Sequence, residues 1–265
     1  MLGLDVAIGI DPGLVLAGAI VGLTVGLTGM GGGALMTPML VLLFGVPPLT
    51  AVSSDLVVSL VMKPVGGAIH WRRGTVRTDL ARWLVVGSVP AAFAGAALVG
   101  TMEPAGVEGW LRRALGLALV ASAVMMVMRA RFAAARGSAR APVSSPVSPA
   151  LTVGVGAIGG FVVGLTSVGS GTLVIVLLMW LYPTLTPAEL VGTDLVQAVP
   201  LVGAAAFGHL LFGEVVFALT LSLLVGGIPG VYLGARMSAR ASQRVVRPAL
   251  LAVLLTSGLK LLQVI

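Results

Sequence analysis

The chain has 265 residues, of which 58% are hydrophobic and only 9% are charged, and its mean hydropathy is +1.11. An ordinary soluble domain carries about 25% charged residues, so a soluble fold is excluded and most of the surface must face lipid. The chain has no cysteine, which excludes disulfides and thiolate metal sites, and its net charge is +7.

Ten apolar runs predict an all-α membrane protein, since a crossing needs roughly 20 apolar residues. Two of the runs, 34–46 and 172–182, are too short to span, and we expect half-helices or re-entrant segments there. The N-terminus has no basic region, so we expect no cleaved signal peptide. In chain order the runs cover about 12–29, 34–46, 49–70, 79–100, 107–128, 151–167, 172–182, 187–210, 215–235 and 245–264.

The chain divides into two copies of one repeat of about five segments each. Val25–Thr28 recurs as Val163–Thr166 at a shift of 138 residues, and Asp55 recurs as Asp194 at a shift of 139. The two histidines, His70 and His209, are also equivalent. We therefore predict a first transmembrane repeat over 1–128, a basic, Ser- and Pro-rich cytoplasmic linker over 129–149, and a second transmembrane repeat over 150–265.

The arginines predict that the two copies are inverted. Arg72, Arg73 and Arg77 follow the third run, whereas the equivalent loop of the second copy holds only Glu214. Basic loops stay in the cytoplasm, so equivalent loops would lie on opposite sides of the membrane. Inverted repeats are typical of secondary transporters, whose sites lie between the repeats near the midplane.

Each copy contains a glycine-rich break, at Thr28–Gly33 and at Thr166–Gly171. Glycine disfavours a helix, so free N–H groups and the N-terminus of the following helix, at Ala34 or Thr172, would form an anion-binding nest. The alternative is that these glycines only allow tight packing. We assign packing alone to the ladders at Gly18, Gly22 and Gly26 and at Gly156, Gly160 and Gly164.

Acids and a lysine inside apolar runs are costly and usually functional. Asp55 and Asp194 are candidate coupling residues, and proton exchange is favoured because an ionised carboxylate would repel an anion. The alternatives are coordination of a cation, holding the broken segments through their backbone N–H groups, and helix capping. Lys63 lies eight residues after Asp55 and would either balance the charge of Asp55 or attract an anion, with Gln197 as the polar residue near Asp194. His70 and His209 are candidate proton relays or interfacial caps.

The candidate residues fall into two groups. For substrate binding they are Thr28, Gly29, Gly31, Gly32, Gly33, Ser54, Lys63, Thr166, Ser167, Gly169, Ser170, Gly171, Thr172, Thr193 and Gln197. For coupling they are Asp55, Asp194, His70 and His209. We expect no metal and no cofactor.

The ordered motifs Gly26–Gly33 with Pro38, Gly45–Pro47, Ala51–Leu56, and their second copy through Gly164–Gly171 and Val191–Asp194 resemble the TauE/SafE family of sulfite exporters. The resemblance covers about residues 12–263. It implies a multi-pass protein of a bacterial inner membrane that exports sulfite or an organosulfonate. Ser53-Ser54-Asp55 departs from the Gly-Thr-Ser common in that family.

The residues and the resemblance together predict a secondary transporter that works by alternating access with proton coupling. A passive anion channel, and an importer of another sulfur oxyanion or a carboxylate, are the alternatives. We expect no enzyme, since the chain has no His-Glu-x-x-His motif, no cysteine nucleophile and no ATP-binding loop. The partners would be the small anion and the lipid bilayer, with no nucleic acid, and the sequence leaves a homodimer open.

Overall fold

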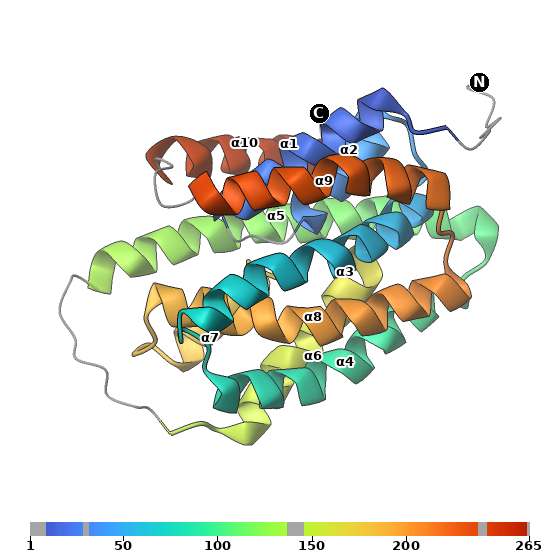
Figure 1. The fold of residues 1–265 in the computed structure, drawn as a ribbon. Coiled ribbons are helices and arrows are strands. Elements are labelled where there is room, and N and C mark those ends of the chain that lie inside the picture. The colour runs from blue at the N-terminus through green and yellow to red at the C-terminus, as the bar shows by residue number, and fades with distance from the viewer. Residues whose placement is uncertain (1–8, 29–31, 137–145, 238–242, 264–265) are drawn as a thin grey trace.

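The computed structural model describes residues 9–28, 32–136, 146–237 and 243–263, and over these ranges the chain forms a bundle of helices (Figure 1). The first half contains α1 (Pro12–Thr28), α2 (Gly33–Leu43), α3 (Pro48–Arg72), α4 (Thr78–Gly100) and α5 (Pro104–Arg136). The second half contains α6 (Pro149–Thr166), α7 (Leu173–Leu181), α8 (Pro187–Phe212), α9 (Phe217–Met237) and α10 (Gln243–Leu261).

Six of these helices, α3, α4, α5, α6, α8 and α9, are long and apolar enough to cross a membrane. Helices α1, α2 and the Pro248–Leu261 part of α10 are shorter but apolar. The molecule is therefore a multi-pass membrane protein, and the predicted all-α class is confirmed. The described ranges contain no strand beyond one isolated bridge, between Gly169 and Gly171.

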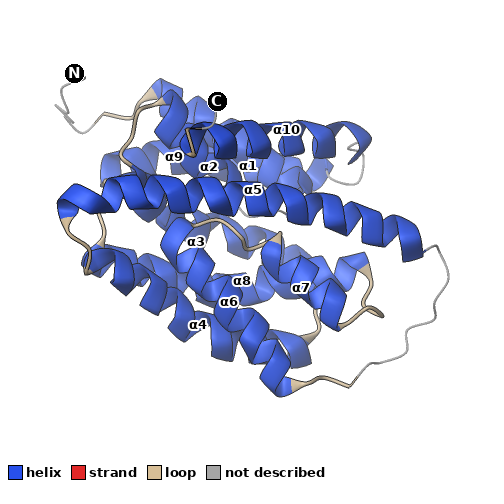
Figure 2. Ribbon diagram, turned by 180° about the vertical axis from the view of Figure 1, so that it is seen from behind, coloured by secondary structure: helices blue, strands red, loops and turns tan. Residues whose placement is uncertain are grey.

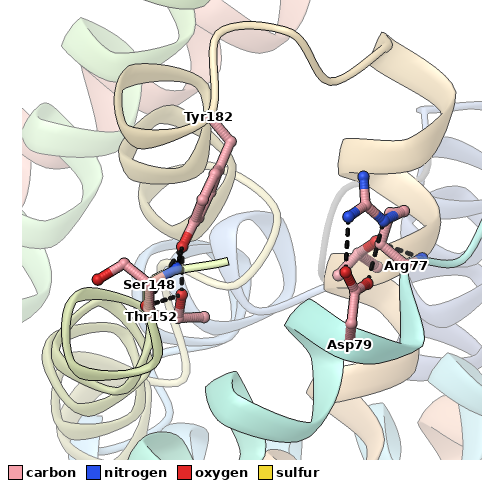
Figure 3. A network of polar contacts seen from close by, with 6 residues as sticks. Arg77, Asp79, Ser148, Thr152 and Tyr182 are labelled. Atoms are coloured by element: carbon pink, nitrogen blue, oxygen red, sulfur yellow. Dashed lines mark hydrogen bonds and ion pairs between the residues drawn. The ribbon is translucent and has the colours of Figure 1, made fainter. Parts of the chain in front are cut away.

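The two short runs form short helices that fold back beside the preceding helix. Helix α7 has 9 residues and α2 has 11. Tyr182, at the end of α7, accepts a hydrogen bond from the backbone N–H of Ser148 at 2.9 Å and lies 2.7 Å from the Thr152 hydroxyl, so α7 ends where α6 begins (Figure 3). A Cβ on Gly13 would lie 3.4 Å from the Phe44 ring, which likewise places the end of α2 beside the start of α1.

The glycine ladders bring helices of different halves into backbone contact, as predicted. A Cβ on Gly18, Gly22 or Gly26 would overlap carbonyl oxygens of α9, and a Cβ on Gly156, Gly160 or Gly164 would overlap those of α4. Small residues allow such close approach in lipid. Each half therefore contributes its first helix to a pair with the fourth helix of the other half, α1 with α9 and α6 with α4.

Helices α3 and α8 pack against each other and run in opposite directions. The start of α3 meets the end of α8, where Ser53 Oγ lies 2.8 Å from His209 Nδ1. Near the start of α8, Thr193 Oγ1 accepts a 3.0 Å hydrogen bond from the Arg77 backbone N–H, just after the end of α3. The inverted relation of the two complete copies stays a prediction.

The linker between the halves is shorter than the predicted range 129–149, because α5 continues to Arg136. The segment Arg129–Arg136 is rich in Ala and Arg, which are strong helix formers. Residues 137–145 of the predicted linker lie outside the described ranges. Figure 2 shows α5 lying along the whole length of one face of the bundle.

Arginines gather at one end of the bundle, where α3, α5 and α9 end and where α4, α6 and α10 begin (left in Figure 1). We call this the arginine-rich end, and its described members include Arg72, Arg73, Arg77, Arg129, Arg131 and Arg236. Arg77 is fixed by two hydrogen bonds to Asp79, of 3.0 and 2.6 Å (Figure 3). The loop from α8 to α9, which holds Glu214, lies at the opposite end.

We expect Gly160→Ala to lower the free energy of unfolding by about 1–3 kcal/mol, because the new methyl group would overlap the backbone of α4 at Ser88. Gly154→Ala in the same helix is the matched control, since a Cβ there would have no neighbour within 4 Å. The control should be neutral or slightly stabilising. Thermal unfolding in detergent measures both, and equal midpoints for the two variants would contradict the close-packing assignment.

Candidate functional site

A buried group of polar side chains lies where α2, α3 and α8 meet the glycine-rich break of the second half. Each member is at most 5% exposed. We call it the central polar cluster, and its members are Thr37, Asp55, Ser59, Lys63, Ser167, Ser170, Asp194 and Gln197.

Asp55 is the best-bonded member of the cluster. Its Oδ2 accepts hydrogen bonds from the hydroxyls of Thr37 at 2.8 Å and Ser167 at 2.7 Å, and its Oδ1 accepts a longer one from Ser59 at 3.4 Å. Thr37 comes from α2 and Ser167 from the end of α6, so one carboxylate joins three elements of both halves. Hydroxyl donors of this kind stabilise the ionised form of a buried acid.

Lys63 lies between the two acids. It donates a 2.6 Å hydrogen bond to Ser170 and interacts electrostatically with both Asp194 and Asp55. Among the described residues it forms no salt bridge within 4.0 Å. With all three groups ionised, the centre carries one positive and two negative charges. A buried charge without a full partner is expensive in lipid, so this arrangement is suited to binding a further ion or proton.

Both carboxylates lie at the breaks. Asp194 accepts a hydrogen bond from Gln197 at 3.1 Å and interacts with the backbone N–H of Gly171, close to the start of α7. A Cβ on Gly32, which precedes α2, would lie 4.0 Å from Asp55 Oδ1. The N-terminus of a helix favours negative charge. In this conformation the protein's own acids therefore occupy the positions where the sequence predicts a bound anion.

The two breaks touch each other. A Cβ on Gly33 would overlap the backbone carbonyl of Ser167, and Ser167 itself adopts a left-handed conformation with φ of 58°. Only a glycine at position 33 permits this contact. The juxtaposition brings donors from one half against the acid of the other.

A pocket of about 130 Å³ connects Lys63 with the arginine-rich end. It lies between α1, α3, α8 and α9, and His70 and Arg73 line it near that end. Its described lining contains no acidic residue. The volume accommodates a few water molecules or one small oxyanion, and the lining is electrostatically suited to an anion.

The structure brings together part of the predicted substrate site. Lys63, Ser167, Ser170, Gly171 and Gln197 contact one another or the two acids, Gly32 and Gly33 adjoin them, and Thr28 lines the pocket. Gly169 lies in the same break. Gly29 and Gly31 lie outside the described residues.

Other predicted residues lie elsewhere and bond differently. Ser54 accepts a 3.3 Å hydrogen bond from the backbone N–H of Val216, and Thr193 accepts the equivalent one from Arg77. Ser54 on α3 therefore holds the loop that follows α8, and Thr193 on α8 holds the loop that follows α3. Thr166 bonds within its own break, and Thr172 donates to Ser122 at 3.0 Å. The role of all these residues in binding stays a prediction.

The histidines lie outside the central polar cluster, at the two ends of the α3–α8 pair. His209 is fully buried, and its Nε2 lies 2.8 Å from the Gly164 carbonyl oxygen while its Nδ1 bonds Ser53. His70 is half-buried, and its Nδ1 lies 2.9 Å from the Thr75 hydroxyl. Their coupling role likewise stays a prediction. No group of three or more His, Asp or Glu residues suited to a metal ion occurs among the described residues.

The sequence analysis did not identify several residues of the site. Ser59 lies one turn after Asp55 on the same helix face, and this four-residue spacing in the sequence could have identified it. Ser88 donates to Gln197 at 3.2 Å and, like Thr37, was an isolated polar residue in an apolar run. Arg129 interacts electrostatically with Asp194, although the sequence placed it in a solvated linker.

A bundle of membrane-crossing helices with buried charges and a pocket that Lys63, His70 and Arg73 line is typical of multi-pass membrane transporters. Residues 14–261 match the family described as sulfite exporter TauE/SafE, and the chain belongs to this family. It is 37% identical over 255 residues to "Probable membrane transporter protein YjnA" of Bacillus subtilis (strain 168), an alignment covering 94% of this chain and 98% of that one. It is 26% identical to "Probable membrane transporter protein YdhB" of the same strain, covering 94% and 99% of the two chains. No solved structure matches.

We expect Asp55→Ala to be destabilised by about 1–3 kcal/mol more than Asp55→Asn, because alanine leaves the buried hydroxyls of Thr37 and Ser167 without an acceptor. Asparagine keeps one oxygen that both hydroxyls can share. Thermal unfolding of the purified variants in detergent checks this. Equal loss in both variants would show that the charge of Asp55, and not its acceptor oxygens, stabilises the fold.

Proposed function

We propose that this transporter exports a small oxyanion, sulfite or an organosulfonate, across the cytoplasmic membrane by alternating access. The observation that carries the proposal is the pocket that leads from the arginine-rich end to Lys63 with His70 and Arg73 along it. Cationic groups at the mouth and the base of a narrow pocket concentrate anions and repel cations. The description of the family as sulfite exporters supports the choice of substrate.

The proposed bound state places the anion between Lys63 and the N-terminus of α7. The anion would take over donors that now serve the protein, the ammonium of Lys63, the Ser170 hydroxyl and the Gly171 N–H. Asp194 occupies the last of these donors. An ionised Asp194 therefore competes with the substrate both for a donor and by charge repulsion.

This competition favours proton coupling. Asp194 faces Lys63, Gln197 and Arg129, and Asp55 faces Lys63 and three hydroxyls. Protonation of one or both acids would free the donors and reduce the negative charge before the anion binds. Anion binding would then be accompanied by proton uptake and would weaken as the pH rises.

The inverted-repeat arrangement that alternating access requires is also part of the proposal. Its supports are the internal repeat in the sequence, the opposite directions of α3 and α8, and the exchange of partners in the pairs α1–α9 and α4–α6. A passive channel would share the pocket. Dependence of flux on a proton gradient separates a coupled transporter from a channel.

The first test is the thermal stability of the purified protein against sulfite, sulfate, thiosulfate, sulfoacetate, taurine, acetate and chloride at several pH values. A ligand at a hundredfold excess over Kd stabilises the folded state by about 2.7 kcal/mol. Stabilisation by sulfite or a sulfonate, with uptake of the same anion in proteoliposomes, supports the proposal. Stabilisation by none of the seven compounds at any pH would contradict the oxyanion proposal.

We expect Lys63→Met to weaken the affinity for that anion about tenfold or more, because a charge-assisted hydrogen bond is lost. Lys260→Met is the matched control: it removes the only other lysine, which is exposed on α10. Isothermal titration measures both affinities. Unchanged affinity in Lys63→Met would remove Lys63 from the site.

We expect Asp55→Asn and Asp194→Asn each to flatten the pH dependence of anion uptake, since a neutral amide cannot exchange a proton. Wild-type uptake should fall as the pH rises, and it should rise with an imposed proton gradient of the right direction. Proteoliposome flux over a pH series measures this. Wild-type flux that depends on neither the pH nor the proton gradient would contradict proton coupling and favour a passive channel.

A further inference from the structure

The two ends of the α3–α8 pair differ, although the residues that form them are equivalent in the repeat. At the arginine-rich end, Gly26, Lys63, Gly66 and His70 line the open pocket, and Arg73 at its mouth is exposed. At the opposite end, the equivalent residues are Gly164, Val202, Ala205 and His209, and all of them are buried. The lining of the pocket therefore has a closed counterpart on the other side of the cluster.

The closed end is held by His209. Its Nε2 lies 2.8 Å from the carbonyl oxygen of Gly164 on α6, and its Nδ1 lies 2.8 Å from the Ser53 hydroxyl on α3. The histidine itself is on α8, so one fully buried side chain ties three helices together. The Ser53 hydroxyl also accepts the backbone N–H of Glu214 at 3.2 Å, which attaches the loop from α8 to α9. We call this arrangement the His209 latch.

The open end carries the equivalent histidine and glycine in a separated state, whereas Gly192 stands at the position equivalent to Ser53. His70 Nδ1 already has a hydroxyl partner, Thr75 at 2.9 Å, but no described residue hydrogen-bonds its Nε2. Gly26, the repeat equivalent of Gly164, lines the same pocket as His70. Closing that pocket would bring His70 Nε2 toward the Gly26 carbonyl oxygen, as His209 Nε2 now meets Gly164.

We propose that His70 and His209 are paired latch residues of the transport cycle, and that each closes one end of the molecule by bonding the carbonyl oxygen of Gly26 or Gly164. In the present conformation the His209 latch is formed and the His70 latch is open. In the opposite conformation the His70 latch is formed, the His209 latch is broken, and a pocket lined by Ala205 and Val202 opens at the other end. This inference rests on the proposed alternating access, but not on which anion is carried.

The latches explain why both histidines lie at the ends of the α3–α8 pair, outside the central polar cluster. A latch needs only partners at the helix ends, and among the described residues neither histidine hydrogen-bonds Asp55 or Asp194. The carbonyl acceptor is a backbone atom, and the Ser53 hydroxyl is the second side chain of the His209 latch. His70 and His209 are therefore positioning residues, acting through the balance between the two conformations.

The test uses the absence of cysteine from the chain. Gly66→Cys reports on the open pocket, where a Cβ would meet only Leu195 at ordinary distances of 3.5 and 3.6 Å, and Ala205→Cys reports on its closed equivalent. Each reporter is made in the wild-type background, with His209→Ala and with His70→Ala. The rate of reaction with a hydrophilic maleimide is measured on purified protein in detergent, where both ends are accessible.

In the wild-type background, Gly66→Cys should react faster than Ala205→Cys. With His209→Ala, the Ala205→Cys rate should rise about tenfold and the Gly66→Cys rate should fall, because loss of a buried hydrogen bond shifts the population toward the opposite state. With His70→Ala, the changes should have the reverse signs. Ser53→Ala removes only one partner of His209 and should act like His209→Ala but more weakly, which provides a test if His209→Ala does not fold.

Reciprocal changes at the two reporters support the latches. A parallel increase at both reporters in His209→Ala would mean general loosening and would overturn the proposal, as would rates that no histidine variant changes. The measurement uses no substrate, so its failure is distinct from failure of the oxyanion proposal. Reciprocal changes without any sulfite binding would keep the latches and remove only the substrate.

Discussion

A buried carboxylate held at the break of a helix is the interaction on which the centre of this molecule depends. In lipid, backbone N–H groups released by a break must find acceptors inside the protein. Asp194 lies where it interacts with the Gly171 N–H, and Asp55 accepts hydrogen bonds from the hydroxyls that α2 and the second break present. The acids thus interact with polar groups that the breaks leave without helix partners, and these groups in turn stabilise the buried carboxylates.

Glycine contacts determine which parts of the bundle can move. Backbone-to-backbone packing joins α1 to α9 and α4 to α6 along most of their lengths, so each pair is expected to behave as a rigid unit. The pair α3–α8 instead meets through larger side chains, hydrogen bonds at its ends and the charged cluster at its middle. Motion between the rigid pairs is therefore most easily accommodated around α3 and α8, where the pocket lies.

Most of the fold was predictable, because each helix in lipid must be an apolar run bounded by polar residues or proline. The Thr186–Glu189 capping box at the start of α8 is an example, and both of its hydrogen bonds are present. Local patterns could not show that α5 continues through Arg129–Arg136, since a basic Ala-rich segment suits both a helix and a solvated loop.

The site was predictable where a residue was conspicuous in its own run, as Asp55, Lys63 and Asp194 are. It was not predictable where the role depends on packing between halves. Ser54 and Thr193 neighbour the acids in sequence, yet the helix turns them away toward the loops. Thr37 reaches Asp55 only because α2 folds back beside α3. Such contacts between distant segments leave no spacing signal.

The two copies keep the same acids but not the same cation. Lys63 is replaced by Val202 in the second copy, and Gln197 by Val58 in the first, so the central polar cluster holds one ammonium beside two carboxylates. A symmetric pair of sites would offer two equivalent places for an anion. With a single ammonium lying between the acids, only one place is electrostatically favourable. In the proposed transport cycle, the repeat would supply two equivalent ends for opening and closing, and its divergence at positions 63 and 202 would confine the charge that attracts the anion to one position shared by both conformations.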